Sequence, residues 1–165
     1  MKGIWKGVIV LTVLLSACDN GPDCTRVVQQ SELDKVDADQ LAVDNQLIDD
    51  YISTNSLGPV EEVNGIKYIL TVQGNGVIPC LENSISFTYK GKFLSNGDTF
   101  DSSINPIEIS LSNLILGWKL VFPTFQKGTK ATLFIPSGYG YGPAGRGSIP
   151  PNANLIFDVE LVGVR

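Results

Sequence analysis

Four segments between residue 66 and the C-terminus alternate apolar and polar side chains with a period of two, and this pattern constrains the fold most strongly. Their apolar sets begin at Ile66, Ile85, Ala131 and Ala153. Such alternation places one set of side chains on a buried face and the other in water, as in an antiparallel sheet. The turn sequence SNGD at 95–98 separates two of the pieces, and seventeen glycines and nine prolines supply further turns. The C-terminal hundred residues are therefore predicted to be strand-rich.

The buried face of this predicted sheet needs a cover, and the segment 117–125 is the candidate. It carries Trp118, Val121, Phe122 and Phe125, while Pro123 limits how far a helix can continue. We therefore expect an α+β fold, with a curved antiparallel sheet of about five strands wrapped around one short helix.

The N-terminal residues are predicted to be an export signal. Lys2 and Lys6 form a basic start, and the apolar run 8–15 is too short to span a bilayer comfortably. The run LSAC that ends at Cys18 resembles the bacterial lipobox, a signal in which the cysteine thiol is lipidated and the peptide is cut before it. We expect residues 1–17 to be a lipoprotein signal peptide. An ordinary signal peptide with an incidental cysteine is the alternative.

This interpretation places the chain at the bacterial cell envelope, anchored in the membrane by acyl chains such as palmitate on Cys18 and facing the periplasm or the cell exterior. Which membrane holds the anchor stays open, because Asp19 directly after the cysteine is a retention signal in some bacteria only.

Residues 18–30 are expected to be a flexible tether, followed by a helical segment over 31–58. Apolar residues recur at roughly helical spacing, Ser31 is a plausible N-cap, and we predict one helix from about 32 to 54. Two roles stay open for this helix. It packs on its own domain or spaces it from the membrane, or it is a docking or dimerisation element.

The two later cysteines, the absence of histidine and the net charge limit the kinds of reaction and partner that this chain can have. Cys24 and Cys80 would reach an oxidising compartment, where a disulfide and two free thiols are both compatible with the sequence. The chain contains no histidine, which excludes Ser-His-Asp and Cys-His catalysis. The formal net charge of −5 disfavours nucleic acid as the partner.

Four runs carry a resemblance to a known family: FTYKGKFLSNGDTFDSS, PIEISLSNLILGW, KGTKATLFIPSGYGYG and IPPNANLIFDVELVGV. In order and spacing they resemble the FK506-binding-protein (FKBP) family of peptidyl-prolyl cis-trans isomerases, over roughly residues 66–165. The resemblance implies an FKBP-type isomerase domain at 59–165. It also implies proline-containing polypeptides as substrates and an FK506-like macrolide as an expected ligand.

The resemblance also implies a pocket. Trp118 would form its floor, Asp101 would be its carboxylate, and the Ile115 N–H would hold a substrate carbonyl. Tyr89, Phe100 and Phe157 would be its aromatic walls, and Leu114 would line one side together with Ile115. Tyr141 would offer a hydroxyl from a long loop, and Ile149 would guard the rim.

Three departures from the family pattern concern substrate preference and macrolide affinity. The stretch 101–106 has no basic residue, Ile107 stands where phenylalanine is frequent, and the loop 141–149 is about one residue shorter than common forms.

Rotation about an Xaa-Pro bond faces a barrier of ~18–20 kcal/mol but breaks no bond, so no nucleophile, metal or cofactor is expected. Two alternatives remain at this point: a non-catalytic module that binds proline segments or acts as a chaperone, and a structural lipoprotein that positions a partner.

Overall fold

The computed structural model describes residues 24–165. The predicted signal peptide and Cys18 lie outside the described residues. The helices are α1 (Gln30–Leu33), α2 (Ala38–Thr54) and α3 (Leu116–Val121), and the strands are β1 (Glu61–Val63), β2 (Ile66–Val72), β3 (Ser84–Phe93), β4 (Thr99–Ser110), β5 (Lys130–Ile135) and β6 (Leu155–Val164). Four short 3₁₀ turns complete the order: η1 (Leu111–Asn113), η2 (Phe122–Thr124), η3 (Ser137–Tyr139) and η4 (Gly142–Ala144).

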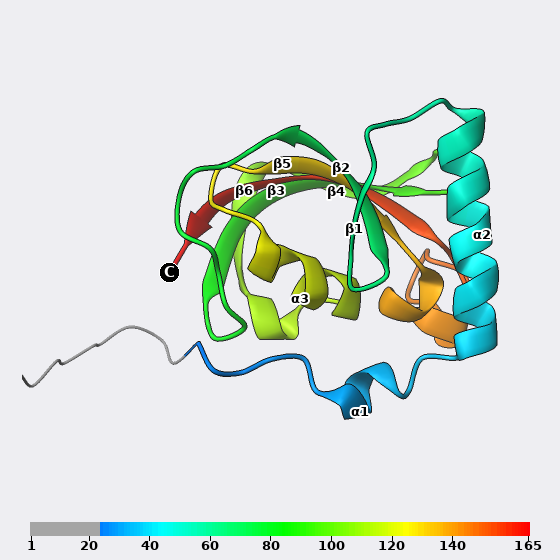
Figure 1. Ribbon diagram of the computed structural model, residues 1–165, viewed down its shortest axis with the longest axis horizontal. Coiled ribbons are helices and arrows are strands. Elements are labelled where there is room, and N and C mark those ends of the chain that lie inside the picture. Colours follow the sequence, from blue (N-terminus) through cyan, green and yellow to red (C-terminus); the bar gives the residue numbers. More distant parts are fainter. Residues whose placement is uncertain (1–23) are drawn as a thin grey trace, which may run out of the picture.

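The strands form one six-stranded antiparallel sheet in the order β1-β2-β5-β6-β3-β4, and the sheet curves around α3 (Figure 1). This confirms the predicted α+β class. The sheet has one strand more than expected, because β1 is only three residues long and its sequence, Glu-Glu-Val, has no readable alternation.

The main core lies between the curved sheet and α3. Trp118 and Val121 of α3 pack against strand residues that include Phe87, Leu133 and Leu161, all of them buried. The period-two pattern is therefore realised as inward-facing side chains on β3, β5 and β6. Burying this aromatic and aliphatic surface is the largest favourable contribution to folding.

The other face of the sheet is not entirely in water, which corrects the simple expectation of one buried and one wet face. Phe134 and Ile156 point away from α3 and are 0% and 2% exposed. They form a second cluster with Ile48 of α2 and with Leu94. Helix α2 therefore packs on its own domain, against the back of the sheet.

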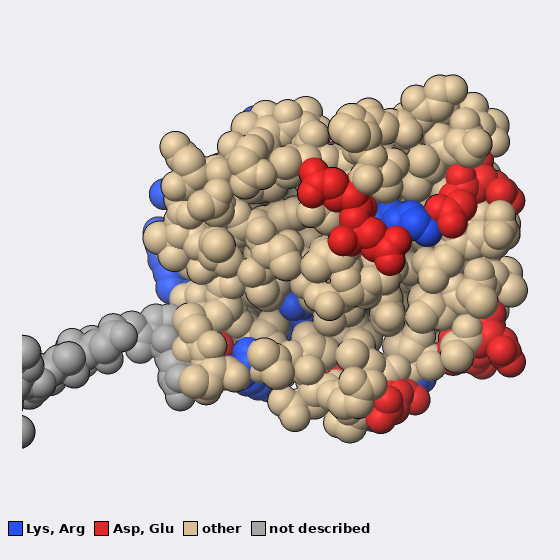
Figure 2. All heavy atoms as spheres, in the orientation of Figure 1, with Lys and Arg blue, Asp and Glu red and all other residues tan. Residues whose placement is uncertain are grey.

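The N-terminal helix is broken in two, whereas the sequence pattern predicted one helix with Ser31 as its N-cap. The N-cap of α2 is Asp37, whose Oδ1 accepts hydrogen bonds from the Asp39 and Gln40 N–H groups, each at 3.0 Å. A capping aspartate starts a new helix at this point, so α1 is a single separate turn. Figure 2 shows acidic side chains gathered along α2, a helix without a single Lys or Arg.

A disulfide joins Cys24 to Cys80, with 5.4 Å between their Cα atoms. Of the two states that the sequence leaves open, the structure therefore contains the bridge. It fixes the start of the N-terminal segment to the loop before β3. None of the helices between residues 24 and 165 combines the length and the hydropathy needed to cross a bilayer.

Candidate active site

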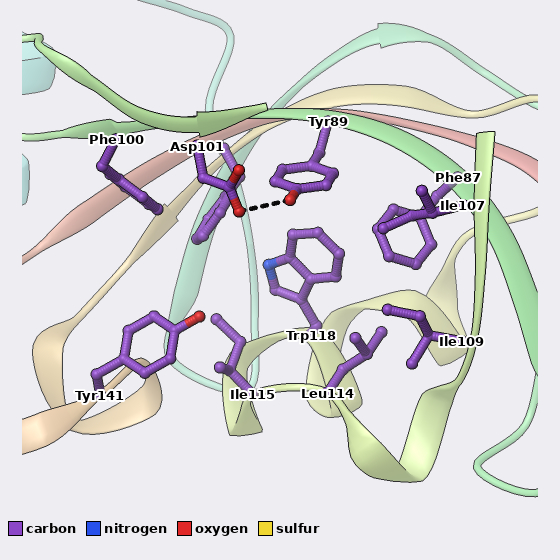
Figure 3. Close-up of a pocket in the computed structure, with 11 residues that line it drawn as sticks. Phe87, Tyr89, Phe100, Asp101, Ile107, Ile109, Leu114, Ile115, Trp118 and Tyr141 are labelled. Atoms are coloured by element: carbon purple, nitrogen blue, oxygen red, sulfur yellow. Dashed lines mark hydrogen bonds between the residues drawn. The ribbon is translucent and has the colours of Figure 1, made fainter. Parts of the chain in front are cut away.

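A pocket with a volume of about 150 Å³ opens between α3 and the inner face of β3, β4 and β6 (Figure 3). Apolar and aromatic side chains make up most of its wall. The lining residues are Phe87, Tyr89, Phe100, Asp101, Ile107, Ile109, Leu114, Ile115, Trp118, Tyr141 and Phe157.

Trp118 forms the floor from the first turn of α3 and is only 4% exposed. Its indole meets the ring of Phe87 edge to face at 4.9 Å between centroids, and that of Phe157 at 5.1 Å. Such edge-to-face contacts fix the ring orientation as well as burying area. The indole Nε1 is buried and has no hydrogen-bond partner within the described chain.

Because Gly91 has no side chain, two aromatic rings can pack directly against the backbone of β3 and form a wall of the pocket. A Cβ built on Gly91 would lie 2.5 Å from Phe100 Cζ and 2.9 Å from Phe157 Cε1. Any side chain at this position of β3 would therefore displace both rings. The two rings pack edge to face, with 5.6 Å between centroids.

The pocket carboxylate is engaged by protein groups. Tyr89 donates its hydroxyl to Asp101 Oδ2 at 2.6 Å, and the Ser102 N–H donates to Asp101 Oδ1 at 2.9 Å. Burial, with added contributions from the hydrogen bond and charge of Asp101, raises the pKa of Tyr89 to about 12. Tyr89 therefore stays protonated, and stays a donor, across the physiological pH range.

Tyr141 reaches the pocket from the loop after β5, and its hydroxyl points toward the pocket centre in Figure 3. Burial raises the pKa of Tyr141, and the Arg146 guanidinium, 5.9 Å from the ring centroid, opposes that shift. No protein group within residues 24–165 hydrogen-bonds to this hydroxyl. It is thus a neutral donor that is available to a bound molecule.

Ile115 supplies a second available donor. It precedes α3 with extended dihedral angles, φ −60° and ψ 154°, and its side chain lines the pocket. Its carbonyl accepts from the Trp118 and Lys119 N–H groups, but within the described chain its own N–H has no acceptor. A substrate carbonyl can therefore bind there without displacing a protein hydrogen bond.

The structure brings together every residue that the resemblance assigned to the pocket except Ile149. That side chain is 8% exposed and belongs to the core, while its N–H and C=O pair with the backbone of Arg146, each at 2.9 Å. Ile149 does not line the pocket in this structure, and its role at the rim stays a prediction. The backbone pairing with Arg146 turns the loop and directs the side chain inward.

Phe87 and Ile109 also line the pocket, although the sequence motifs predict no pocket role for either. Each lies two residues from a residue already singled out, Tyr89 and Ile107, and shares its strand face. That spacing was the available signal. Among residues 24–165, no group of His, Cys, Asp or Glu side chains comes together in a way that could bind a metal ion.

Comparison with known proteins gives a consistent result. Residues 65–162 match the family description "FKBP-type peptidyl-prolyl cis-trans isomerase". The chain is 35% identical over 150 residues to the FKBP-type isomerase FkpA of Aeromonas hydrophila, covering 84% of this chain but 56% of that protein. It is 38% identical over 106 residues to FK506-binding protein 1 of Gibberella zeae, covering 59% of this chain and 96% of that protein.

Solved structures agree in fold. FkpA of Escherichia coli superposes with a TM-score of 0.67 at 30% identity, covering 82% of this chain and 64% of that one. A peptidyl-prolyl cis-trans isomerase of Pseudomonas syringae pv. tomato gives a TM-score of 0.65 at 29% identity, covering 76% of this chain and 92% of that one. The chain thus spans about half the length of the Aeromonas FkpA that it matches. With the pocket, the fold and the match over residues 65–162 in agreement, the chain belongs to the FKBP-type peptidyl-prolyl cis-trans isomerase family.

Proposed function

We propose that this protein accelerates rotation about Xaa-Pro bonds in exported polypeptides and so assists their folding at the cell envelope. The single observation that carries the proposal is the apolar, aromatic pocket over Trp118, flanked by two donors without protein partners in the described chain, the Tyr141 hydroxyl and the Ile115 N–H. Family membership supports the same reaction.

The pocket suits the reaction because the reaction needs no bond chemistry. A planar peptide bond is resonance-stabilised and polar, and twisting it removes that resonance against a barrier of ~18–20 kcal/mol. A twisted amide is less polar than a planar one. A site lined by Trp118, Phe100 and Phe157 therefore disfavours the planar state relative to the twisted state.

The two donors would orient the substrate. The Ile115 N–H would hold a carbonyl on one side of the proline, and the Tyr141 hydroxyl would hold the chain on the other side. Fixing both ends leaves rotation about one bond as the remaining motion, which reduces the entropy lost on reaching the transition state.

Substrate preference follows from the pocket edge. Ile107, Ile109 and Leu114 form an apolar side, so a bulky apolar residue before the proline is the preferred context. An FK506-like macrolide is the proposed inhibitor class, since relatives of this chain are named FK506-binding proteins. The acidic face along α2 supports the expectation that nucleic acid is not a partner.

The test is cis-trans exchange of a Leu-Pro peptide followed by NMR, with the full chain in detergent at micromolar concentration. Acceleration over buffer, lost in a folded Trp118→Leu variant, supports the proposal. Exchange at the buffer rate with retained peptide binding would instead identify a non-catalytic binding module. Exchange at the buffer rate without binding would leave only the role of a structural lipoprotein.

The location is a proposal of its own: acylated Cys18 tethers the domain to the envelope membrane. The basic start at Lys2 and Lys6, the apolar run and the LSAC sequence support it. Two or three acyl chains give stable anchoring, since each buried CH₂ contributes ~0.8 kcal/mol.

A further inference from the structure

Asp44 is a buried carboxylate outside the pocket. It lies in the middle of α2 and is 0% exposed. Ser137 donates to its Oδ2 twice, from the backbone N–H at 2.9 Å and from the hydroxyl at 2.6 Å, while Gln40 Nε2 donates to its Oδ1 at 2.9 Å. No Lys or Arg forms an ion pair with it in the part of the chain that the structure describes.

A carboxylate taken out of water without a cation is costly unless hydrogen bonds satisfy its oxygens. Here two of the three donors belong to Ser137, which is 93 residues away in sequence. Asp44 is therefore bound chiefly to one point of the domain, the first residue of η3.

That point lies at the start of the turn that leads into Tyr141. The turn from Pro136 to Gly140 is closed by two backbone hydrogen bonds of 3.0 Å, and Tyr141 follows directly. The Ser137 N–H is shared with Asn154 Oδ1, also at 2.9 Å, so the turn is held between α2 and the segment before β6. The hydrogen bonds to Asp44 and Asn154 therefore both hold Ser137, which lies four residues before Tyr141 in the chain.

A second contact confirms how closely the N-terminal segment fits this turn. A Cβ built on Gly138 would lie 2.6 Å from Val36 Cγ1. The backbone of η3 therefore lies directly against the segment between α1 and α2. Glu32 of α1 in addition pairs with Lys119 of α3, next to the floor residue Trp118.

We propose that Asp44 is a positioning residue for the isomerase site: it fixes η3 through Ser137 and so places the Tyr141 hydroxyl over the pocket. The effect on turnover rests on the proposed isomerase function, whereas the effect on the loop does not. The N-terminal segment is then part of the working enzyme and not only a spacer.

The kinetic test compares Asp44→Ala with Asp50→Ala in the full chain in detergent. Asp50 is a matched control, because it lies on the same helix, is exposed, and accepts from Gln46 four residues earlier, as Asp44 does from Gln40. If Asp44 acts through the Tyr141 hydroxyl, its loss should lower kcat/KM by about threefold to tenfold, as expected for one neutral hydrogen bond. Asp50→Ala should leave kcat/KM unchanged.

A double-mutant cycle separates positioning from general destabilisation. In a Tyr141→Phe background the hydroxyl is already gone, so Asp44→Ala should then cost less than about twofold. Asp44→Asn should restore most of the activity, because its amide oxygen still accepts from Ser137. Effects of Asp44→Ala and Tyr141→Phe that simply multiply would overturn the proposal.

Hydrogen exchange tests the same idea without any turnover. Asp44→Ala should speed exchange of the hydrogen-bonded Tyr139 and Gly140 amides by about tenfold or more, and leave those of β3 unchanged. If Asp44→Ala does not fold, Ser137→Ala takes its place in the kinetic and the exchange experiments. This substitution removes only the hydrogen bond from the Ser137 hydroxyl to Asp44. Unchanged loop exchange refutes the positioning role even if the enzyme is active, and faster loop exchange supports it even if the wild type proves inactive.

Discussion

The Tyr89 hydroxyl lies 2.6 Å from Asp101 Oδ2 and donates to it, while the second carboxylate oxygen accepts the Ser102 N–H. Both oxygens of the pocket carboxylate are thus occupied by the protein itself. Asp101 is arranged to hold the ring of Tyr89, whose centroid lies 5.9 Å from that of Trp118. A carboxylate in this arrangement organises the wall of the pocket through the Tyr89 hydroxyl.

Replacing that carboxylate should therefore be tolerated. Asp101→Leu removes the charge at similar volume, and Tyr89 keeps its ring contacts, so more than about a tenth of kcat/KM should remain, as for the loss of one hydrogen bond. Peptide exchange rates, compared on folded fractions checked by circular dichroism, measure this. Abolished turnover in a well-folded Asp101→Leu protein, together with activity in Trp118→Leu, would instead require electrostatic or acid–base catalysis.

Tyr141→Phe should lower kcat/KM by about threefold to tenfold, because the hydroxyl contributes one neutral hydrogen bond to the bound chain. The aromatic ring stays in place, so stability should change little. Kinetics with a Leu-Pro peptide, alongside the melting temperature, check both parts. An unchanged kcat/KM would show that this hydroxyl does not orient the substrate.

Stability at high pH should report the environment of Tyr89. Its pKa is raised to about 12, chiefly by burial, while the unfolded chain ionises tyrosine near 10. This contribution to stability is therefore intact below pH about 10 and is lost as pH rises from about 10 to about 12. Tyr68 behaves alike, because burial and the Glu61 hydrogen bond raise its pKa to about 12. Thermal melts should show Tyr89→Phe losing less stability than wild type over that range; parallel losses in the two proteins would contradict the shift.

The Cys24–Cys80 bridge should stabilise the fold substantially, since it closes a loop with a sequence separation of 56 residues. Chain-entropy estimates give about 4 kcal/mol for a loop of this length. Urea unfolding of the oxidised protein against a Cys24→Ser, Cys80→Ser variant measures the difference. Labelling of both cysteines in the oxidised, denatured protein would show that the bridge does not form.

Lipidation of Cys18 has a direct signature. Mass spectrometry of the mature protein should find an acylated cysteine at its N-terminus, and Cys18→Ala should release the chain from membranes or block processing. A mature chain that begins elsewhere without a lipid would exclude the anchor.

Local periodicity predicts much of this fold. Strands β2, β3, β5 and β6 coincide with the four alternating segments, because each presents every second side chain to the core. Strand β1 is too short to show a period. The helix break before α2 depends on Asp37, which caps the new helix. This cap is hard to recognise in the sequence, because the apolar repeat continues across the break.

The site was predictable only in part, and through several separated motifs together. Tyr89, Trp118 and Phe157 come from three elements, and nothing in their local sequence distinguishes a pocket wall from a core. The inward turn of Ile149 depends on backbone pairing with Arg146, which side-chain patterns do not encode. The Asp44–Ser137 contact spans 93 residues and joins a helix to a turn that share no common motif.

The disulfide also determines where mechanical load would enter the domain. Cys24 is covalently joined to Cys80, and next to it the N-terminal segment runs past α3 to α2 (Figure 1). A pull on the chain before Cys24 is carried through the sulfur–sulfur bond to the loop before β3, whose strand pairs with two neighbours. The contacts of Glu32, Val36 and Asp44 with the pocket supports lie inside the closed covalent loop and are shielded from that force. Under such a force the oxidised protein would keep its Tyr141 loop in place, whereas in the reduced protein the N-terminal segment would separate from the domain first.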